Sequence, residues 1–167
     1  MPSNIELKIR WKSPESAIHK AESFGASYSK TMEQVDTYFS IKDGKLKLRE
    51  ILGERAELIY YNRQGDRKWR SDYVIAGTMD PENLKIILGS ILRVLVVVKK
   101  RRLLYLVDNA RIHIDEVEGL GSFIEFEVII REGEDQAAEL LKRLRDHFMV
   151  SEENVLKVSY SDLLMKV

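Results

Sequence analysis

The chain begins with a strict alternation of polar and apolar side chains. The apolar residues are Ile5, Leu7, Ile9 and Trp11, and every residue between them is charged. Successive side chains of a β-strand point to opposite faces, whereas an α-helix would scatter these residues around its surface. The pattern therefore predicts a strand over residues 4–12 with one apolar face and one charged face.

The same alternation recurs further along the chain. Leu46 and Leu48 separate three basic residues, and Ile124, Phe126 and Val128 flank two glutamates. A single strand of this kind is ordinarily half exposed, with its charged face in solvent. If several such strands close into a barrel covered by helices, their charged faces instead face one another across a lumen. Such a lumen would suit a polyanion and its metal ions.

The composition narrows the class of protein. A length of 167 residues suits one domain with a real hydrophobic core, so we expect a single domain over residues 1–167. The net charge of zero gives no reason to expect a nucleic-acid or membrane partner. The absence of cysteine excludes disulfides and thiolate metal sites, and it fits a cytoplasmic protein. No apolar stretch is long enough to span a bilayer.

Turn and capping residues divide the chain into eight strands and three main helices. Tight turns such as Asp43-Gly44 join most strands, so the sheet should be largely antiparallel, and eight strands suit a closed barrel. We therefore expect an α+β fold, a closed eight-stranded, mainly antiparallel β-barrel with helices packed outside. The expected helices are 14–24, 81–92 and 134–148, the expected strands are 4–12, 34–41, 45–51, 56–63, 68–75, 93–107, 111–117 and 122–131, and a short helical segment follows from about residue 151.

Four carboxylates at polar strand positions are candidate metal ligands. Hard cations such as Mg²⁺ and Mn²⁺ prefer oxygen ligands, usually one or two carboxylates together with substrate phosphates. Two of the four are separated by one residue, which places their side chains on one strand face about 7 Å apart, close enough to bracket one ion. The four are Glu6, Asp115, Glu125 and Glu127.

Basic residues occupy polar positions of the other strands. An arginine fork matches phosphate oxygens in bidentate fashion, and a lysine acts as a point charge. Basic residues beside metal-binding carboxylates are typical of sites that act on nucleotides or polyphosphates. The candidates are Lys8, Arg10, Lys47 and Arg49, with either Lys99 and Arg101 or Lys100 and Arg102, between which the alternation does not decide.

Five motifs, in order along nearly the whole chain, resemble those of one family. Asn4 to Lys8 matches an opening Glu-x-Glu-x-Lys, and Lys47 to Glu50 matches a basic-Leu-Arg-Glu strand. Lys100 to Arg102 matches a Lys-x-Arg strand, which selects Lys100 and Arg102. The most specific run, Ile112 to Glu127, resembles His-x-Asp-x-Val-x-x-Leu-Gly-x-Phe-x-Glu-x-Glu, and Ser159 to Leu164 is similar to a C-terminal segment. The family is the CYTH superfamily of triphosphate tunnel proteins, and its class IV adenylyl cyclase branch is the most similar.

The resemblance implies a tunnel that binds a nucleoside triphosphate or inorganic triphosphate with Mg²⁺ or Mn²⁺. It implies conversion of ATP to cyclic AMP and pyrophosphate, with Asp115 and Glu127 as catalytic residues. By the same resemblance the metal ligands would be Glu6, Asp115, Glu125 and Glu127, and the triphosphate would contact Lys8, Arg10, Lys47, Arg49, Arg63, Lys100, Arg102 and Lys157.

Two other functions remain open at this stage. A triphosphatase would use the same tunnel to hydrolyse inorganic or organic triphosphate. A non-catalytic polyphosphate- or nucleotide-binding module would need only the charges, and Asn4 favours it, because Asn4 stands where the first carboxylate of the family's opening motif belongs. That departure leaves the number of metal ions open. The base preference and a homodimeric state are also left open.

Overall fold

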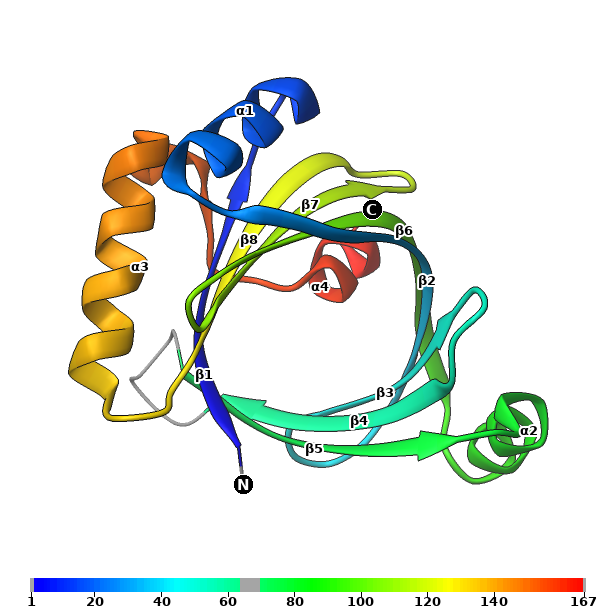
Figure 1. The fold of residues 1–167 in the computed structure, drawn as a ribbon. Helices are drawn as coiled ribbons and strands as arrows, with labels where there is room; N and C mark the ends of the chain where they lie inside the picture. The colour runs from blue at the N-terminus through cyan, green and yellow to red at the C-terminus, as the bar shows by residue number, and fades with distance from the viewer. Residues whose placement is uncertain (1, 64–69, 167) are drawn as a thin grey trace.

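The computed structural model describes residues 2–63 and 70–166, with the side chain of Arg63 left out. Figure 1 shows the strands arranged as a ring, with three of the helices outside it and the C-terminal helix within its outline. The elements in chain order are β1 (Ser3–Arg10), α1 (Pro14–Phe24), β2 (Ser27–Phe39), β3 (Lys45–Ile51), β4 (Ala56–Arg63), β5 (Arg70–Thr78), α2 (Pro81–Ile91), β6 (Val94–Val107), β7 (Ala110–Val117), β8 (Gly121–Ile129), α3 (Glu134–Phe148), the 3-10 turn η1 (Glu152–Asn154), β9 (Val155–Leu156) and α4 (Tyr160–Met165).

Eight strands close into an antiparallel barrel. Their hydrogen-bonded order is β5-β4-β3-β2-β6-β7-β8-β1, and β5 pairs with β1 to complete the ring. Both β5 and β9 use the same edge of β1: β5 pairs with residues 3–5, and the two-residue β9 pairs with Lys8 and Ile9. The predicted closed, eight-stranded barrel is therefore confirmed, and β9 is an additional short strand that the alternation did not indicate.

The main apolar core lies outside the barrel, between its wall and helices α1 and α3 (Figure 1). Leu7 and Ile9 of β1 are fully buried and belong to one cluster with Leu144 and Phe148 of α3. Burying each side chain of this size contributes about 1.5–3 kcal/mol. Because the odd-numbered residues of β1 are held under the helices, its even-numbered residues lie on the opposite face, and Asn4, Glu6 and Lys8 line the interior of the barrel.

The two helices that open with proline each follow a capping residue, Ser13 before α1 and Asp80 before α2. The side chain of Ser13 accepts a hydrogen bond from the backbone N–H of Ser16, and Asp80 accepts one from Asn83. Gly25 ends α1 in the left-handed region at φ 99°, a conformation that glycine adopts without steric cost.

Among the described residues, no helix is both long and apolar enough to cross a membrane.

Two segments differ from the sequence-based expectation. Strand β2 starts at Ser27 instead of residue 34. The sequence pattern did not reveal its first half, because that half is mostly exposed and a bulge after Tyr28 interrupts the alternation. The C-terminal segment is not one helix. Ser159 and Asp162 form a capping box that starts α4 anew after β9. Residues 68 and 69 of the predicted strand 68–75 lie outside the described residues.

Candidate functional site

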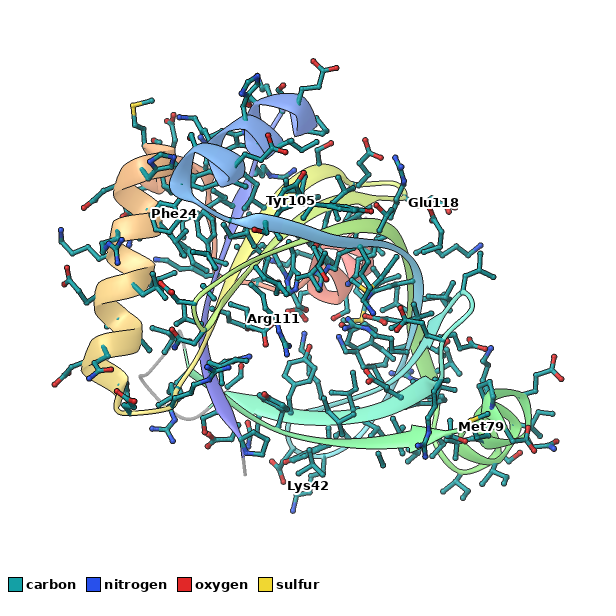
Figure 2. The ribbon with its side chains drawn as sticks, viewed as in Figure 1. Phe24, Lys42, Met79, Tyr105, Arg111 and Glu118 are labelled. Carbon is teal, nitrogen blue, oxygen red and sulfur yellow. The ribbon has the colours of Figure 1, made fainter. Side chains whose placement is uncertain are left out.

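The barrel encloses a cavity of about 290 Å³, to which all eight of its strands contribute side chains. We call this cavity the lumen. Figure 2 shows side chains projecting into the ring, with Arg111 among them. The charged lining residues are Lys8, Lys47, Arg49, Lys100, Arg102 and Arg111, with Glu6, Glu57, Glu125 and Glu127.

A basic wall, formed by Lys47 and Arg49 of β3 with Lys100 and Arg102 of β6, is organised around a buried carboxylate on β2. Asp36 is fully buried and accepts hydrogen bonds from Arg49 Nε and Nη2 at 2.8 Å and from Lys47 Nζ at 3.1 Å. Lys100 Nζ lies 3.5 Å from the same carboxylate. One anion thus positions three cations and leaves an excess of positive charge toward the lumen.

Burial and neighbouring charges shift the pKa values of these groups. Burial alone would raise the pKa of Asp36, but Arg49, Lys47 and Lys100 hold it well below its usual range. Burial, with repulsion from Arg49, lowers the pKa of Lys47 to about 8. Burial, with repulsion from Arg102, also lowers the pKa of Lys100. A lysine whose pKa is about 8 is partly neutral in mildly alkaline solution, and its neutral form can act as a base.

Arg102 is fixed by a bidentate ion pair with Asp115. Arg102 Nε and Nη2 lie 2.6 Å from the two oxygens of Asp115, which is fully buried. The hydroxyl of Tyr160 donates to Asp115 Oδ2 at 2.6 Å. Although burial disfavours its charge, Arg102 keeps the pKa of Asp115 below its ordinary value. Both carboxylate oxygens are therefore engaged, and Asp115 orients Arg102.

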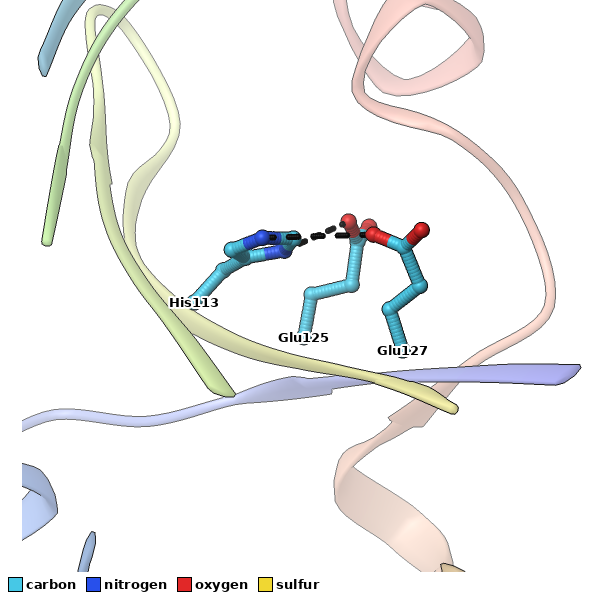
Figure 3. Close-up of side chains that lie close together, drawn as sticks. All are labelled: His113, Glu125 and Glu127. Carbon is cyan, nitrogen blue, oxygen red and sulfur yellow. Dashed lines mark hydrogen bonds and ion pairs between the residues drawn. The ribbon is translucent and has the colours of Figure 1, made fainter. Parts of the chain in front are cut away.

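An acidic wall is formed by Glu6 of β1 with Glu125 and Glu127 of β8. Glu6 stands directly opposite Glu127 in the β1–β8 register. Lys8 Nζ pairs with Glu125 Oε2 at 2.8 Å. Behind this wall, His113 Nδ1 lies 3.3 Å from Glu125 Oε1, and its Nε2 lies 3.9 Å from Glu127 Oε2 (Figure 3). Ligand atoms of His113, Glu125 and Glu127 all lie within 4.8 Å of one another.

Asn4 contributes an unusual buried amide at the edge of the acidic wall. It is 5% exposed, and its Nδ2 donates to Glu127 Oε1 at 2.8 Å. Among the described residues its Oδ1 has no hydrogen-bond partner. Leaving a buried polar atom unpaired costs about 1–3 kcal/mol, a cost that a bound cation would remove. Carboxylates beside an unpaired amide oxygen are a donor set that fits a divalent cation.

A third wall, on β4 and β5, is aromatic and aliphatic. It consists of Ile59, Tyr61, Tyr73 and Ile75, of which Tyr61 and Tyr73 are directly paired across the two strands. It borders the basic wall, where Lys47 Nζ lies 5.5 Å from the centre of the Tyr61 ring. Such a surface offers flat apolar contacts beside the charges that fill the rest of the lumen.

Comparison with protein families identifies the family to which this barrel belongs. The sequence model of the CYTH domain matches residues 3–160, nearly the whole chain. The chain belongs to the CYTH family. Its barrel is the triphosphate tunnel fold of that family, as the motifs from Asn4 to Leu164 predicted. A search of curated proteins found no match.

Solved structures share this CYTH fold over almost their full length. The PH1012 protein of Pyrococcus horikoshii is 26% identical, with a TM-score of 0.89 over 96% of this chain and 98% of that chain. A candidate adenylate cyclase of Vibrio parahaemolyticus is 21% identical, with a TM-score of 0.78 over 96% and 97% of the two chains. HpAC1 of Hippeastrum, described as a candidate adenylyl cyclase with a dominant triphosphatase activity, is 15% identical, with a TM-score of 0.70 over 99% and 95%.

Most residues proposed from the sequence line the lumen of this CYTH barrel. In β6, Lys100 and Arg102 are the residues that face the lumen. They are buried inside the barrel, whereas Lys99 and Arg101 are exposed outside it. The predicted residues that line the lumen are Glu6, Lys8, Lys47, Arg49, Lys100, Arg102, Glu125 and Glu127.

Three predicted residues are placed differently. Arg10 is exposed at the end of β1, with its guanidinium 5.2 Å from the centre of the Phe123 ring, and Lys157 is exposed after β9. Neither is among the residues that line the lumen. Asp115 is also absent from the lining, since Arg102 and Tyr160 cover its oxygens. The side chain of Arg63 lies outside the described residues.

Sequence reasoning missed several residues of the site. Arg111 shares the strand parity of His113 and Asp115, so the alternation in β7 could have identified it. Asp36 gave no such signal, because an isolated carboxylate in an irregular strand does not reveal which cations surround it. Tyr160 lay in a matched motif, but only the fold brings its ring and hydroxyl into the lumen.

Proposed function

We propose that the protein is a metal-dependent enzyme that binds ATP in the lumen and converts it to cyclic AMP and pyrophosphate. The observation that carries this proposal is the division of one cavity into a basic, an acidic and an aromatic wall. The basic wall would bind a triphosphate, the acidic wall a divalent cation and the aromatic wall a nucleoside. Inorganic triphosphate has no nucleoside to contact the aromatic wall.

The basic wall would hold the phosphate chain. Arg49 and Arg102 are fixed by buried carboxylates before any ligand arrives, so little reorganisation is needed when charge builds up on the phosphates. Lys47 and Lys100 add point charges between the two forks. Pyrophosphate, which carries the negative charge released by cyclisation, would be stabilised by the same groups.

The acidic wall would hold Mg²⁺ or Mn²⁺ through Glu6, Glu125 and Glu127. When bound, such an ion supplies positive charge to the phosphate oxygens and lowers the pKa of a coordinated hydroxyl. Because Asp115 is committed to Arg102, we assign it the positioning of that arginine instead of a metal-ligand role. Arg111, which pairs with Glu127 at 3.5 Å, would add a further cation at the rim.

In the reaction, the ribose 3′-oxygen forms a bond to the α-phosphorus as the bond from that phosphorus to the β-phosphate oxygen breaks. The hydroxyl proton must leave during this step. Glu127 stands in the acidic wall and is our candidate acceptor. The ribose must be folded so that the attacking oxygen is in line, and the β4–β5 wall, with Tyr61 and Tyr73, would hold the nucleoside in that position.

One observation favours triphosphate hydrolysis as a second candidate function. Because the pKa of Lys47 is lowered to about 8, its neutral form becomes available in mildly alkaline solution and could take a proton from a water molecule beside the phosphate chain. Hydrolysis needs no contact with a nucleoside. HpAC1, which shares this fold, is described as having a dominant triphosphatase activity.

A product assay distinguishes these functions. The full-length protein is incubated with ATP or inorganic triphosphate and Mg²⁺ or Mn²⁺, and the products are separated by chromatography. We expect cyclic AMP and pyrophosphate from ATP. Orthophosphate formed much faster than cyclic AMP would favour the hydrolase, and binding without any product would favour a binding module. Arg102→Ala and its outward neighbour Arg101→Ala form a matched pair, of which only the first should lose activity.

A further inference from the structure

Two buried polar side chains of the lumen each have an atom without a hydrogen-bond partner. Asn4 is 5% exposed and Ser71 is 3% exposed, and both line the lumen. Across the residues that the structure describes, Asn4 Oδ1 and Ser71 Oγ lack a partner. A buried polar atom that stays unpaired is unfavourable, so two such atoms in one cavity indicate a ligand with a polar group.

The two side chains lie at the seam where the barrel closes. Asn4 of β1 and Ser71 of β5 are directly opposite each other in the register that joins these strands, close to the N-terminus (Figure 1). Residues opposed in this way on one face of a sheet have Cβ atoms about 4.5–5.5 Å apart. A single small group of a ligand can therefore contact both side chains.

The two atoms need different partners. The carboxylate of Glu127 only accepts, so it takes the amide hydrogen of Asn4 Nδ2 and leaves Oδ1 as a free acceptor. Ser71 instead supplies a hydroxyl hydrogen, which needs an acceptor. A divalent cation would satisfy Asn4 Oδ1 but would leave that hydrogen unpaired. A ligand hydroxyl satisfies both atoms, since it donates to Asn4 Oδ1 and accepts from Ser71 Oγ.

The surroundings of the pair favour a hydroxyl of ribose. Asn4 Nδ2 donates to Glu127 Oε1 at 2.8 Å, so the amide touches the residue assigned to take the 3′-hydroxyl proton. Ser71 shares its strand face with Tyr73 of the aromatic wall. The pair thus lies between the acidic wall and the aromatic wall. The sugar is the part of a nucleotide that joins the phosphates to the base.

We propose that Asn4 and Ser71 bind the ribose 2′-hydroxyl and make the site selective for ribonucleotides over 2′-deoxyribonucleotides. This role rests on the proposed function, which brings the neighbouring 3′-oxygen to Glu127, and it adds the specificity for the sugar. A nucleotide without the 2′-hydroxyl leaves both buried atoms unpaired. A site built to hydrogen-bond a substrate hydroxyl discriminates strongly against an analogue that lacks it.

Nucleotides that each lack one hydroxyl test this selectivity on the native, full-length protein. Calorimetric titrations compare ATP, 2′-deoxy-ATP and 3′-deoxy-ATP in the presence of Mn²⁺, at a temperature at which no product forms. We expect 2′-deoxy-ATP to bind about 10–100-fold more weakly than ATP. The matched analogue 3′-deoxy-ATP keeps the 2′-hydroxyl and should bind more tightly than 2′-deoxy-ATP. Equal affinities for ATP and 2′-deoxy-ATP would overturn the proposal.

Replacing Ser71 by Ala tests the contact itself. The variant should bind ATP about tenfold more weakly and 2′-deoxy-ATP as the native protein does, because only ATP carries the group that Ser71 contacts. The lost hydroxyl has no partner among the described residues, so its removal breaks no hydrogen bond of the fold. Ser29→Ala, at an exposed position of β2, is the control and should keep the native preference. Equal losses for both nucleotides in Ser71→Ala would contradict the contact.

The selectivity and the proposed function fail separately. Tighter binding of ATP than of 2′-deoxy-ATP, without any cyclic AMP in the product assay, contradicts the cyclase and supports the role of Asn4 and Ser71. Cyclic AMP formation by a protein with equal affinities for the two nucleotides contradicts that role and supports the cyclase.

Discussion

Tyr160 donates its hydroxyl to Asp115 at 2.6 Å, and so joins the C-terminal helix α4 to the wall of the barrel. The same ring lies 3.7 Å from Lys8 Nζ, which pairs with Glu125. The hydroxyl of Tyr160 therefore contacts Asp115, which orients Arg102 of the basic wall. Its ring contacts Lys8, which is paired with the acidic wall. The C-terminal segment is thus part of the site.

Replacing Tyr160 by Phe should test this link, because it keeps the ring beside Lys8 and removes only the hydroxyl. A hydrogen bond to a charged group is worth about 1.5–3 kcal/mol, so we expect a loss of this size in the free energy of unfolding, with reduced turnover as Arg102 loosens. Denaturant titration and product assays measure both. Tyr28→Phe, which removes an exposed hydroxyl bonded to Thr31, is the control. Native-like values for both variants would contradict the link.

Arg102 and Arg101 offer a matched comparison of the two faces of β6. Arg102→Lys cannot make the bidentate pair and leaves Asp115 buried and partly unsatisfied, so we expect destabilisation of about 1–3 kcal/mol and weaker triphosphate binding. Arg101→Lys, on the exposed face, should change stability by less than about 0.5 kcal/mol. Denaturant unfolding and calorimetry with inorganic triphosphate measure both effects. Equal behaviour of the two variants would refute the assigned faces.

Acid should destabilise the protein through Asp36. Its pKa in the folded state lies well below its ordinary value, and an aspartate in an unfolded chain titrates near about 3.9. The stabilisation is therefore complete above about pH 4–5 and is lost as the pH falls toward the lower, folded-state pKa. Thermal melts from pH 7 to pH 3 should show this decline. Asp36→Asn should be less stable at pH 7 with a flatter dependence on pH, and parallel curves for the two proteins would contradict the assignment.

Neutralising the acidic wall should abolish metal-dependent turnover while leaving the fold intact. Glu127→Gln keeps the size of the side chain and removes the charge that a hard cation requires, so we expect loss of Mn²⁺-dependent product formation and at least about tenfold weaker Mn²⁺ binding. Calorimetry and product assays provide the measurements. Glu116→Gln, on the exposed face of β7, should retain both properties. Full activity of Glu127→Gln would remove this residue from the metal site.

The sequence by itself determined which face of β1, β3 and β8 is charged. Alternation with a period of two follows from strand geometry, so residues such as Glu6, Lys47 and Glu125 could be assigned to one side before any fold was known. The motif resemblance then selected Lys100 and Arg102 over their neighbours. The closed barrel and its outer helices followed, because the apolar faces had to be covered.

Only the tertiary structure decided how deep each side chain lies and which partner it meets. Arg10 has the parity of Lys8 but stands at the end of β1, outside the lumen, since alternation fixes a side and not a position along the barrel. Asp115 pairs with Arg102 and with Tyr160, 45 residues further along the chain. Such partners are set by the register and closure of distant strands, and local sequence periodicity carries no information about them.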